Sequence, residues 1–428
     1  MIALTALLVL LVILVLAIPV AAGLGWLGLV LNALFSPLSL VVTVGEVAWS
    51  STTSFILVAI PFYVMLGEIL LRTGMAEKMY NAIAHWVSWI PGGLMHSNIV
   101  ACAVFGAPSG SSVATAVTIG TVAMGEIKKH KYNEPLFLGT IAAGGTLGIL
   151  IPPSITMVVY GALTDTSIPK LYLAGFIPGF VLAAMFMLTV LGACLWRPEW
   201  GGTPIRSNWS LRLRTLPDLL PVTIILLAVI GSIYAGLATA TEAAALGIVA
   251  ALGLAAYERR LNIKVFGDIF AGTIRTTGMI MAIVIGAYFL NVIITSTGLP
   301  NQIKDLVNYL NLSPLGTLMI IIVFYLILGM FMETLSMMVA TIPITTPIVV
   351  AAGYDPIWYG ILVTLLMETA LLTPPVGMNL FVVQGIRERG QLRDVIVGTA
   401  PFIVTLALMI ILIVAYPGIA MWLPNQFE

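Results

Sequence analysis

Apolar runs about 20 residues long recur along this chain, and they constrain its fold more than any other feature. A helix of roughly 20 apolar residues is long enough to cross the hydrocarbon core of a bilayer. Of the 428 residues, 60% are hydrophobic and 8% are charged, whereas about a quarter of the residues of a soluble domain are charged. Because a soluble fold could not bury so much apolar surface, the sequence predicts an all-α polytopic membrane protein surrounded mostly by lipid.

Composition and motifs argue against several other classes of protein. The 18 basic and 18 acidic residues balance, so the bulk charge indicates no nucleic-acid partner. Cys102 and Cys194 have no disulfide or metal-ligand spacing and are interpreted as small core residues. Residues 23–28 match the dinucleotide-binding pattern GxGxxG, but they lie in an apolar run and follow no strand. No GxxxxGK[ST] motif is present, so the chain is not expected to hydrolyse ATP through a P-loop.

The positions of the basic residues predict the topology. Thirteen of the 18 fall in four short polar stretches, 128–131, 197–214, 259–264 and 387–393. Basic residues in short loops mark the cytoplasmic side, so an even number of crossings must separate each pair of stretches. The apolar runs fit this count, with expected spans at 2–31, 54–71, 135–163, 171–196, 219–237, 243–257 and 395–416. We therefore expect the N-terminus inside and the C-terminus outside.

The first apolar run could be mistaken for a cleaved signal peptide. It lacks the basic segment that begins such a peptide, and the run from Ile2 to Leu31 is longer than the apolar core of one. We therefore interpret this run as a retained first span.

Two apolar stretches fit no simple span. Residues 93–125 begin and end inside by this count and are interrupted at 106–112, whereas residues 315–352 begin and end outside and are interrupted at 329–336. Non-helical backbone at membrane depth is tolerated only where protein or a water-filled cavity satisfies its polar groups. We therefore expect two re-entrant helical hairpins whose tips form part of a site.

A short amphipathic helix is expected before each hairpin. Met79 and Ile83 lie on an apolar face opposite Glu77 and Lys78, and residues 303–310 show the same separation of apolar and polar positions. Helices of this kind lie in the membrane interface rather than crossing the bilayer.

The two halves of the chain share an ordered set of motifs. Thr73-Gly74 recurs as Thr297-Gly298, Pro91 as Pro314, Ala114-Thr115 as Ala340-Thr341, and Pro152-Pro153 as Pro374-Pro375. Because the first hairpin opens inward and the second outward, we predict inverted repeats, with a site at the repeat interface as in many secondary transporters. The predicted organisation is N-terminal scaffold spans (1–74), a first repeat (75–196), a linker with further scaffold spans (197–298) and a second repeat (299–428).

The hairpin tips and the proline pairs carry the candidate ligands. Two adjacent prolines remove two backbone donors and break the helical hydrogen-bond ladder. The carbonyl and hydroxyl oxygens freed at such a break suit a hard cation such as sodium, and the N-terminus of a half-helix suits an anion. An anionic substrate and sodium are therefore expected to share one region.

Each candidate also has a structural interpretation. Gly, Ser and Thr are common close-packing residues between membrane helices, although the repetition of the motifs favours a functional role. Glu333 and Glu368 lie in apolar surroundings beside the breaks of the second half and are candidate functional carboxylates. Structural pairing near the ends of spans is the favoured interpretation for Glu68, Glu242 and Arg275.

Three motifs, in order along the chain, resemble one transporter family. They are GAPSGSSVAT at 106–115, GGTLGILIPPS at 144–154 and LTPPVGMN at 372–379, and they resemble the large membrane subunit of tripartite ATP-independent periplasmic (TRAP) transporters over essentially the whole chain. The resemblance implies a bacterial inner-membrane protein whose transport domain moves as an elevator against a scaffold. It also implies sodium (Na+) coupling, a separate small four-helix membrane subunit, and a periplasmic substrate-binding protein that delivers a carboxylate-bearing solute.

The motifs and the resemblance together single out the candidate site residues. The substrate is expected to be bound by Ser109, Ser111, Ser112, Ser154 and Asn379. Sodium is expected to be bound near Ser109, Gly110, Thr115, Gly145, Gly148, Gly329, Glu333, Ser336, Thr369, Thr373 and Gly377. The family commonly has an aspartate at the position of Thr115, whose hydroxyl can still offer an oxygen to sodium.

The favoured function is sodium-driven import of an organic anion, sialic acid or a C4-dicarboxylate being typical substrates of the family. A second hypothesis is a sodium/dicarboxylate carrier of the same architecture that needs no binding protein. A third, from a different class, is an intramembrane enzyme with Ser109 as its nucleophile, but the chain has only three histidines and none lies in the later spans where a base would be needed.

Overall fold

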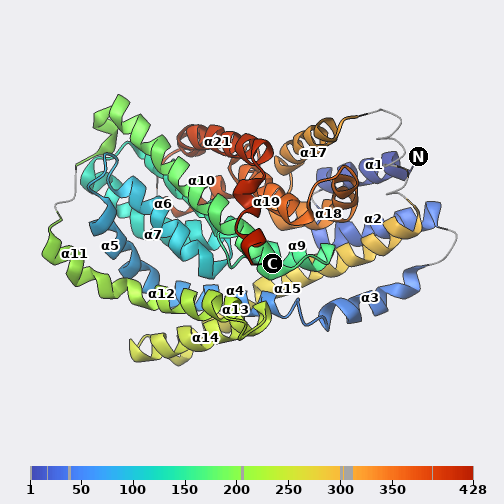
Figure 1. Cartoon of the computed structure of the whole chain (residues 1–428), viewed down its shortest axis with the longest axis horizontal. Helices are drawn as coiled ribbons and strands as arrows, with labels where there is room; N and C mark the ends of the chain where they lie inside the picture. Colours follow the sequence, from blue (N-terminus) through green and yellow to red (C-terminus); the bar gives the residue numbers. More distant parts are fainter. Residues whose placement is uncertain are drawn as a thin grey trace.

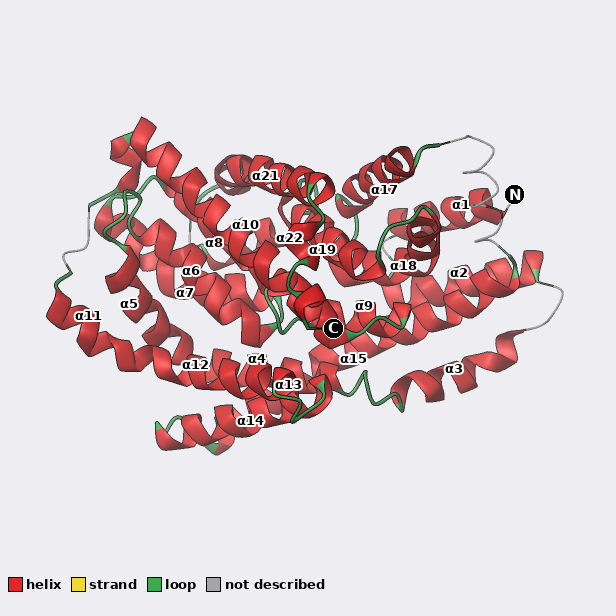
Figure 2. Cartoon of the chain, in the orientation of Figure 1, coloured by secondary structure: helices red, strands yellow, loops and turns green. Residues whose placement is uncertain are grey.

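The chain is helical throughout the part that the structure describes. The computed structural model describes residues 2–16, 18–36, 40–203, 207–298, 302, 312–387 and 389–427, and these ranges contain no strand (Figure 2). Within them, six helices are long and apolar enough to cross a membrane, and up to eight if each bent helix pair counts as one span. These features confirm the all-α polytopic class.

The N-terminal run folds differently from the prediction. The expected single span over 2–31 is wrong, because the chain forms two helices, α1 (Ile2–Val15) and α2 (Val20–Phe35). Pro19, which precedes α2, has an extended ψ of 131°, and a proline here cannot donate the hydrogen bond that would continue α1. Helix α2 packs along α15 (Ile263–Ser296), and α3 (Thr43–Thr52) is a further helix that was not predicted.

A group of helices lies along one side of the molecule in Figure 1. It contains α4 (Ala59–Arg72), α14 (Ala240–Tyr257) and α15, together with a span over Trp209–Tyr234 made of α11 (Trp209–Thr215), α12 (Leu220–Leu226) and α13 (Ser232–Tyr234). Helix α4 packs against both α14 and α15. The hydroxyl of Tyr63 on α4 donates to the carbonyl oxygen of Ala240 at 3.0 Å, which ties α4 to the start of α14.

The predicted amphipathic helix before the first hairpin is α5 (Met75–Val87), which turns away from α4 by 70°. Gly74 makes this turn at φ +71°, a conformation that suits glycine. Met79 and Ile83 are buried, whereas Glu77 is exposed, as the pattern predicted. Gly298 has nearly the same φ, +69°, so the two Thr-Gly motifs end their helices alike. The second amphipathic helix, expected over 303–310, lies outside the described residues.

Both predicted hairpins are present. The first consists of α6 (Leu94–Ser109) and α7 (Ser112–His130), and the second of α17 (Pro314–Gly329) and α18 (Thr334–Ala351). Figure 1 shows the two hairpins at opposite ends of the molecule.

A broken helix follows each hairpin. Helices α8 (Glu134–Leu150) and α9 (Ile155–Thr164) meet at Pro152-Pro153 with a 40° bend, and α19 (Pro356–Leu372) and α20 (Met378–Ile386) are separated at Pro374-Pro375. The residues before these prolines, Ile151 and Thr373, are both extended, as prolines require of their predecessors. A long helix then follows in each half, α10 (Ile168–Trp196) and α21 (Leu392–Ala415), with a short α22 (Gly418–Met421) near the C-terminus.

One predicted repeat correspondence is out of register. The N-caps of α7 and α18 are Ser111 and Glu333, an offset of 222 residues that equals the offset of the proline pairs. Thr115 therefore lies four residues after its cap, whereas Thr341 lies eight residues after the equivalent cap. The pairing of Ala114-Thr115 with Ala340-Thr341 is thus wrong by about one helical turn, while the pairing of the proline pairs agrees with the structure.

The two repeats are joined at the contact between α8 and α21. A side chain built on Gly139 would overlap the backbone of Gly398, so the two helices touch backbone to backbone. Arg387 adds a polar link, because its guanidinium contacts Glu134 at the start of α8 and Asp394 at the start of α21, each at 2.8 Å. The broken helix of the first half is therefore packed directly onto the last long helix of the second.

Candidate functional site

The tips of both hairpins meet at one cavity of about 460 Å³. Since the hairpins lie at opposite ends of the molecule (Figure 1), their tips approach this cavity from opposite directions, as expected for inverted repeats. Helices α4 and α15 and the two broken helices form the rest of its wall. The polar and glycine residues that line it are Gly67, Glu68, Ser109, Gly110, Ser111, Ser112, Thr156, Thr276, Glu333 and Thr334.

The first tip presents three serines to the cavity. Ser111 caps α7, its hydroxyl accepting a hydrogen bond from the backbone N–H of Ala114 at 3.3 Å. Ser109 donates to the carbonyl oxygen of Gly106 and shares a 2.9 Å hydrogen bond with the hydroxyl of Thr115. The hydroxyl of Ser112 is buried and has no hydrogen-bond partner. A buried hydroxyl without a partner is costly unless a ligand satisfies it, so Ser112 is a candidate ligand-binding residue.

Four helix N-termini converge on this cavity. Ser112 and Val113 begin α7, Ile155 and Thr156 begin α9, Thr334 and Leu335 begin α18, and Met378 begins α20, and all of these residues line it. The first N–H groups of a helix have no carbonyl partner within it, and the helix dipole places partial positive charge there. Neither Ser154, before α9, nor Gly377, before α20, caps its helix with a side chain. The arrangement can bind an anion without any basic side chain.

The first tip is packed tightly against the first broken helix. A Cβ on Gly148 of α8 would lie 2.9 Å from the hydroxyl oxygen of Thr115 and 3.1 Å from the carbonyl oxygen of Ser111. A Cβ on Gly110 would lie 3.3 Å from the backbone nitrogen of Ile155. The predicted sodium-site residues of the first half, Ser109, Gly110, Thr115 and Gly148, are thus brought together around several hydroxyl and carbonyl oxygens.

Gly145 lies at a contact between the two repeats. A Cβ on it would lie 3.2 Å from the side-chain nitrogen of Asn379, at the start of α20. This nitrogen donates to the carbonyl oxygen of Ala142 at 3.0 Å, while the side-chain oxygen of Asn379 is buried without a hydrogen-bond partner. That oxygen is the right type of ligand for a hard cation, although Asn379 does not line the cavity.

The second tip carries a carboxylate where the first carries a serine. Glu333 caps α18, its oxygens accepting hydrogen bonds from the backbone N–H groups of Leu335 at 3.1 Å and Ser336 at 2.9 Å. The hydroxyls of Thr334 and Ser336 also donate to it. Glu333 is therefore held by the helix N-terminus itself, and it is one of the residues that line the cavity.

The second tip also contacts the second broken helix. A Cβ on Gly329 would lie 2.5 Å from the Cβ of Ala370 on α19, and the backbone N–H of Val376 donates to the carbonyl oxygen of Met330 at 3.2 Å. The hydroxyls of Thr369 and Thr373 donate to carbonyl oxygens within their own segment. The predicted residues of the second half thus lie at the junction between the hairpin and the helix break.

Ser154, like Asn379, lies apart from the three serines of the first tip. It is fully buried, and its hydroxyl donates to the carbonyl oxygen of Ile149 at 2.7 Å. It is not among the residues that line the cavity, so its hydrogen bond closes the helix break instead.

Glu68 is a cavity-lining residue that the sequence reasoning assigned to structure. It lies on α4 and forms an ion pair of 2.7 Å with Arg72, as that interpretation expected, but it also lines the cavity. The only sequence signal for a role of Glu68 in the cavity was an acidic residue in an apolar run. That signal was not enough, because tertiary packing decides which face of α4 meets the hairpins. Glu242 instead caps α14 through Thr239, in agreement with its structural interpretation.

Glu368 is a buried carboxylate outside the cavity. Neither of its oxygens has a hydrogen-bond partner within 3.5 Å, and the side chain is fully buried. Thr146, on α8, is a polar neighbour of this carboxyl group. The two residues are 222 positions apart, which is also the offset of the proline pairs, so equivalent positions of the two repeats face each other here.

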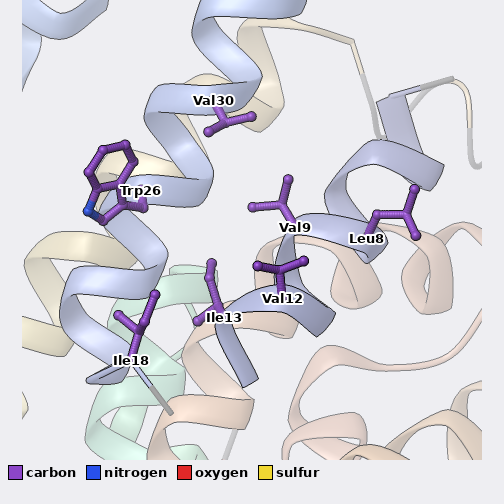
Figure 3. A pocket seen from close by; sticks show the side chains of 7 residues that line it. All are labelled: Leu8, Val9, Val12, Ile13, Ile18, Trp26 and Val30. Atoms are coloured by element: carbon purple, nitrogen blue, oxygen red, sulfur yellow. The ribbon is translucent and has the colours of Figure 1, made fainter. Parts of the chain in front are cut away.

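A second cavity, of about 340 Å³, lies between α1 and α2. Figure 3 shows that its lining consists of aliphatic side chains and the indole ring of Trp26. Without hydroxyls, carboxylates or a helix N-terminus, this cavity is suited to neither an organic anion nor sodium.

The described residues contain no cluster of His, Cys, Asp or Glu that could hold a transition metal. The donors around the hairpin tips are hydroxyl, carbonyl and carboxylate oxygens, which suit a hard cation. His96 contacts the carbonyl oxygen of Pro91 near the start of α6, far from Ser109 at the end of that helix. The described part of the chain therefore places no histidine beside Ser109 to act as a base.

Comparisons with known proteins agree with this geometry. The family model for the tripartite ATP-independent periplasmic transporter, DctM component, matches residues 7–419. A C4-dicarboxylate TRAP transporter large permease protein of Vibrio cholerae is 30% identical over 96% of this chain and 95% of its own length. A sialic acid TRAP transporter large permease protein of the same species is 31% identical over 87% of each chain. An ectoine TRAP transporter large permease protein of Halomonas elongata is 33% identical over 86% of each chain.

The fold is also found among solved structures. The crystal structure of the Alcanivorax borkumensis YdaH transporter superposes with a TM-score of 0.63 and 15% sequence identity, covering 98% of this chain and 99% of the other. At this identity the likeness concerns the fold alone. The match to the family model over nearly the whole chain, with relatives at 30% identity or more, decides the assignment: this chain belongs to the DctM component family of tripartite ATP-independent periplasmic transporters.

Proposed function

We propose that this chain is the transport subunit of a sodium-coupled importer that moves a small carboxylate-bearing solute across the bacterial inner membrane. The observation that carries the proposal is the cavity where two hairpin tips and four helix N-termini meet, with the unpartnered hydroxyl of Ser112 in its wall. Relatives of this chain are named as permeases for C4-dicarboxylates, sialic acid and ectoine. These names describe permeases, which disfavours the hypothesis of an intramembrane enzyme.

In the proposed mechanism, sodium ions bind at the two junctions between a hairpin tip and a helix break and order the tips. The substrate carboxylate then accepts hydrogen bonds from Ser112 and from the first N–H groups of α7 and α9. Close packing of the tip against Gly148 and Ile155 supports this order of events, because an ion at the junction and the geometry of the tip depend on the same oxygens. The carboxylate is thus held by dipoles and hydroxyls rather than by a fixed positive charge.

The proposed motion is of elevator type. The hairpins and broken helices would slide as one unit past a scaffold that includes α4 and α15. Gly67 of α4 supports this proposal, because it faces the backbone of Ser109 without an intervening side chain: a Cβ there would lie 3.1 Å from the carbonyl oxygen of Ser109. The absence of a side chain at Gly67 lets the tip of the first hairpin lie directly against α4, where the moving unit would meet the scaffold.

The family works with a small membrane subunit and a periplasmic binding protein, and we propose that both are separate chains here. The basic stretches support a periplasmic C-terminus. The cytoplasmic N-terminus was predicted from a single crossing over residues 2–31. Because the chain breaks at Pro19 into two helices, the proposed topology rests on the later spans instead.

The direct test is sodium-gradient-driven uptake of labelled organic acids into proteoliposomes that contain this chain, its small subunit and its binding protein. We expect uptake only with all components and an inward sodium gradient. Ser109→Ala and Ser111→Ala should each reduce it, whereas Ser313→Ala, at a serine cap outside the cavity, should not. If both tip variants insert normally and retain full uptake, the proposed site is wrong. Uptake by this chain alone would support the carrier that needs no binding protein.

A further inference from the structure

The ionisable side chains around the cavity all have one sign. Among the described residues that line it, Glu68 and Glu333 are ionisable, and no Lys, Arg or His is present. A dicarboxylate placed there would meet two carboxylates and no basic side chain of the chain itself. This distribution of charge is unexpected for a site whose cargo carries only negative groups, because like charges at close range are strongly unfavourable.

The two carboxylates differ in how their charge is balanced. Glu68 has a cation partner, Arg72, at 2.7 Å. Glu333 forms no ion pair with any described residue and is held only by the N–H groups and hydroxyls at the start of α18. Its negative charge is therefore stabilised in place but not neutralised by another side chain.

The hydrogen bonds of Glu333 restrict what can bind beside it. Each of its two oxygens accepts two hydrogen bonds, from Thr334 and Leu335 on one and from the N–H and hydroxyl of Ser336 on the other. A carboxylate offers about four lone-pair positions, so all of them are in use. A cation that needs a direct oxygen ligand would have to displace one of these donors, whereas a quaternary ammonium group, which has no N–H group to satisfy, needs only the nearby negative charge.

The rest of the wall favours a weakly hydrated cargo. Most of the other lining side chains are aliphatic or Met, among them Val64, Leu71, Ile149, Ile280, Leu371 and Met378. Hydroxyls of a sugar acid that lie against these aliphatic groups would have no partner, whereas methyl groups or ring carbons around a charged nitrogen can pack there.

We propose that the cargo is a zwitterion, a carboxylate that also carries a quaternary ammonium or delocalised cationic nitrogen. Its carboxylate lies at the N-termini of α7 and α9 beside Ser112, and its cationic group lies against Glu333. This inference rests on the proposed function and narrows its substrate class. It also assigns Glu333 a role in cargo recognition in addition to capping α18.

The test compares isosteric pairs that differ only in the cationic nitrogen. Glycine betaine and 3,3-dimethylbutyrate form one pair, since a carbon replaces the nitrogen, and ectoine and its carbocyclic analogue form a second; succinate serves as the dicarboxylate. Binding is measured on the purified complex of the large and small membrane subunits in lipid nanodiscs with sodium, so that the binding protein does not select the ligand. We expect the zwitterion of at least one pair to bind about tenfold more tightly than its isostere, and more tightly than succinate.

Substitutions test whether Glu333 causes the preference for the zwitterion. Glu333→Gln should abolish the tenfold difference within the pair, whereas Glu77→Gln, at an exposed carboxylate on α5, should leave that difference intact. Equal binding within both pairs, or tighter binding of succinate, would overturn the inference and leave the carboxylate site intact. A Glu333→Gln variant that weakens both members of a pair equally and needs more sodium would identify Glu333 as a sodium ligand and also overturn it. Absence of binding by every carboxylate would contradict the proposed function itself.

Discussion

The two hairpin tips have the same architecture and opposite electrostatics. At the first tip the cap of α7 is the neutral Ser111, and the adjacent Ser112 hydroxyl has no partner. At the second tip the cap of α18 is the carboxylate of Glu333, which accepts four hydrogen bonds. The first helix N-terminus is thus open to an external anion, whereas the second already holds an anion of its own. The two repeats thus share a fold at their tips but differ in the charge of the cap.

Under the proposed function, this difference lets a symmetric scaffold hold an asymmetric cargo. A site built from two identical tips would offer the same partial charge at both ends. With one neutral and one acidic cap, the same backbone arrangement distinguishes the two ends of a small molecule. Exchanging the cap residues between the two tips therefore tests directly whether their difference in charge matters for transport.

The largest effect is expected from giving the first tip the charge of the second. Ser111→Asp should cap α7 with a carboxylate and place a negative charge where the substrate carboxylate binds, lowering uptake by about 100-fold. The thermal stability of the variant should be unchanged or higher, because a carboxylate is favourable at a helix N-terminus.

The matched control for this variant is Ser313→Asp, which makes the same substitution at the cap of α17, outside the cavity. It should leave proteoliposome uptake unchanged. Normal uptake by a well-folded Ser111→Asp variant would show that the N-terminus of α7 does not bind the substrate.

A smaller effect is expected from the reverse exchange. Glu333→Ser keeps a side chain that can cap α18 but removes the charge, so uptake of the natural cargo should fall by about tenfold. Asp355→Ser is the control, since Asp355 caps α19 in the same way from outside the cavity. Uptake and thermal unfolding are measured for both; an equal loss of uptake in the two variants would mean that capping, rather than charge at the cavity, is responsible.

The smallest effect is expected from removing the unpartnered hydroxyl. Ser112→Ala breaks no hydrogen bond within the protein, so stability should not change, while the KM for uptake should rise by about three- to tenfold, as expected for the loss of one hydrogen bond worth about 1 kcal/mol. Ser154→Ala should show the opposite, a loss of about 1 kcal/mol of stability from its bond to Ile149. A Ser112→Ala variant with unchanged KM would remove this hydroxyl from the binding site.

Much of this architecture could be predicted from local sequence. The interruptions at 106–112 and 329–336 and the two proline pairs break helices by backbone chemistry that acts within a few residues, and the hairpins and broken helices appear where they were predicted. The exception is the first run, where the chain breaks at Pro19 inside the apolar stretch that was predicted as one span.

Other features depend on contacts between distant segments. The sequence does not reveal that Glu68 lines the cavity, because this requires α4 to pack between the first hairpin and α15. Nor does the repeat pattern reveal that Ser111 and Glu333 are equivalent, since a one-turn shift makes Thr115 and Thr341 look like partners. The roles at the tips follow from cap positions, which become visible only in three dimensions.

The contact between Gly139 and Gly398 has a consequence for how tightly ion movement is coupled to cargo movement. Two helices that touch backbone to backbone at this point, with Arg387 bridging their ends, cannot shift past each other without losing that contact. Under the proposed mechanism, the binding groups contributed by the two repeats must then cross the membrane together. Slippage, in which an ion moves without cargo or cargo without ions, is then opposed by the packing of α8 against α21. This constraint adds to the one that comes from the order in which ions and cargo bind.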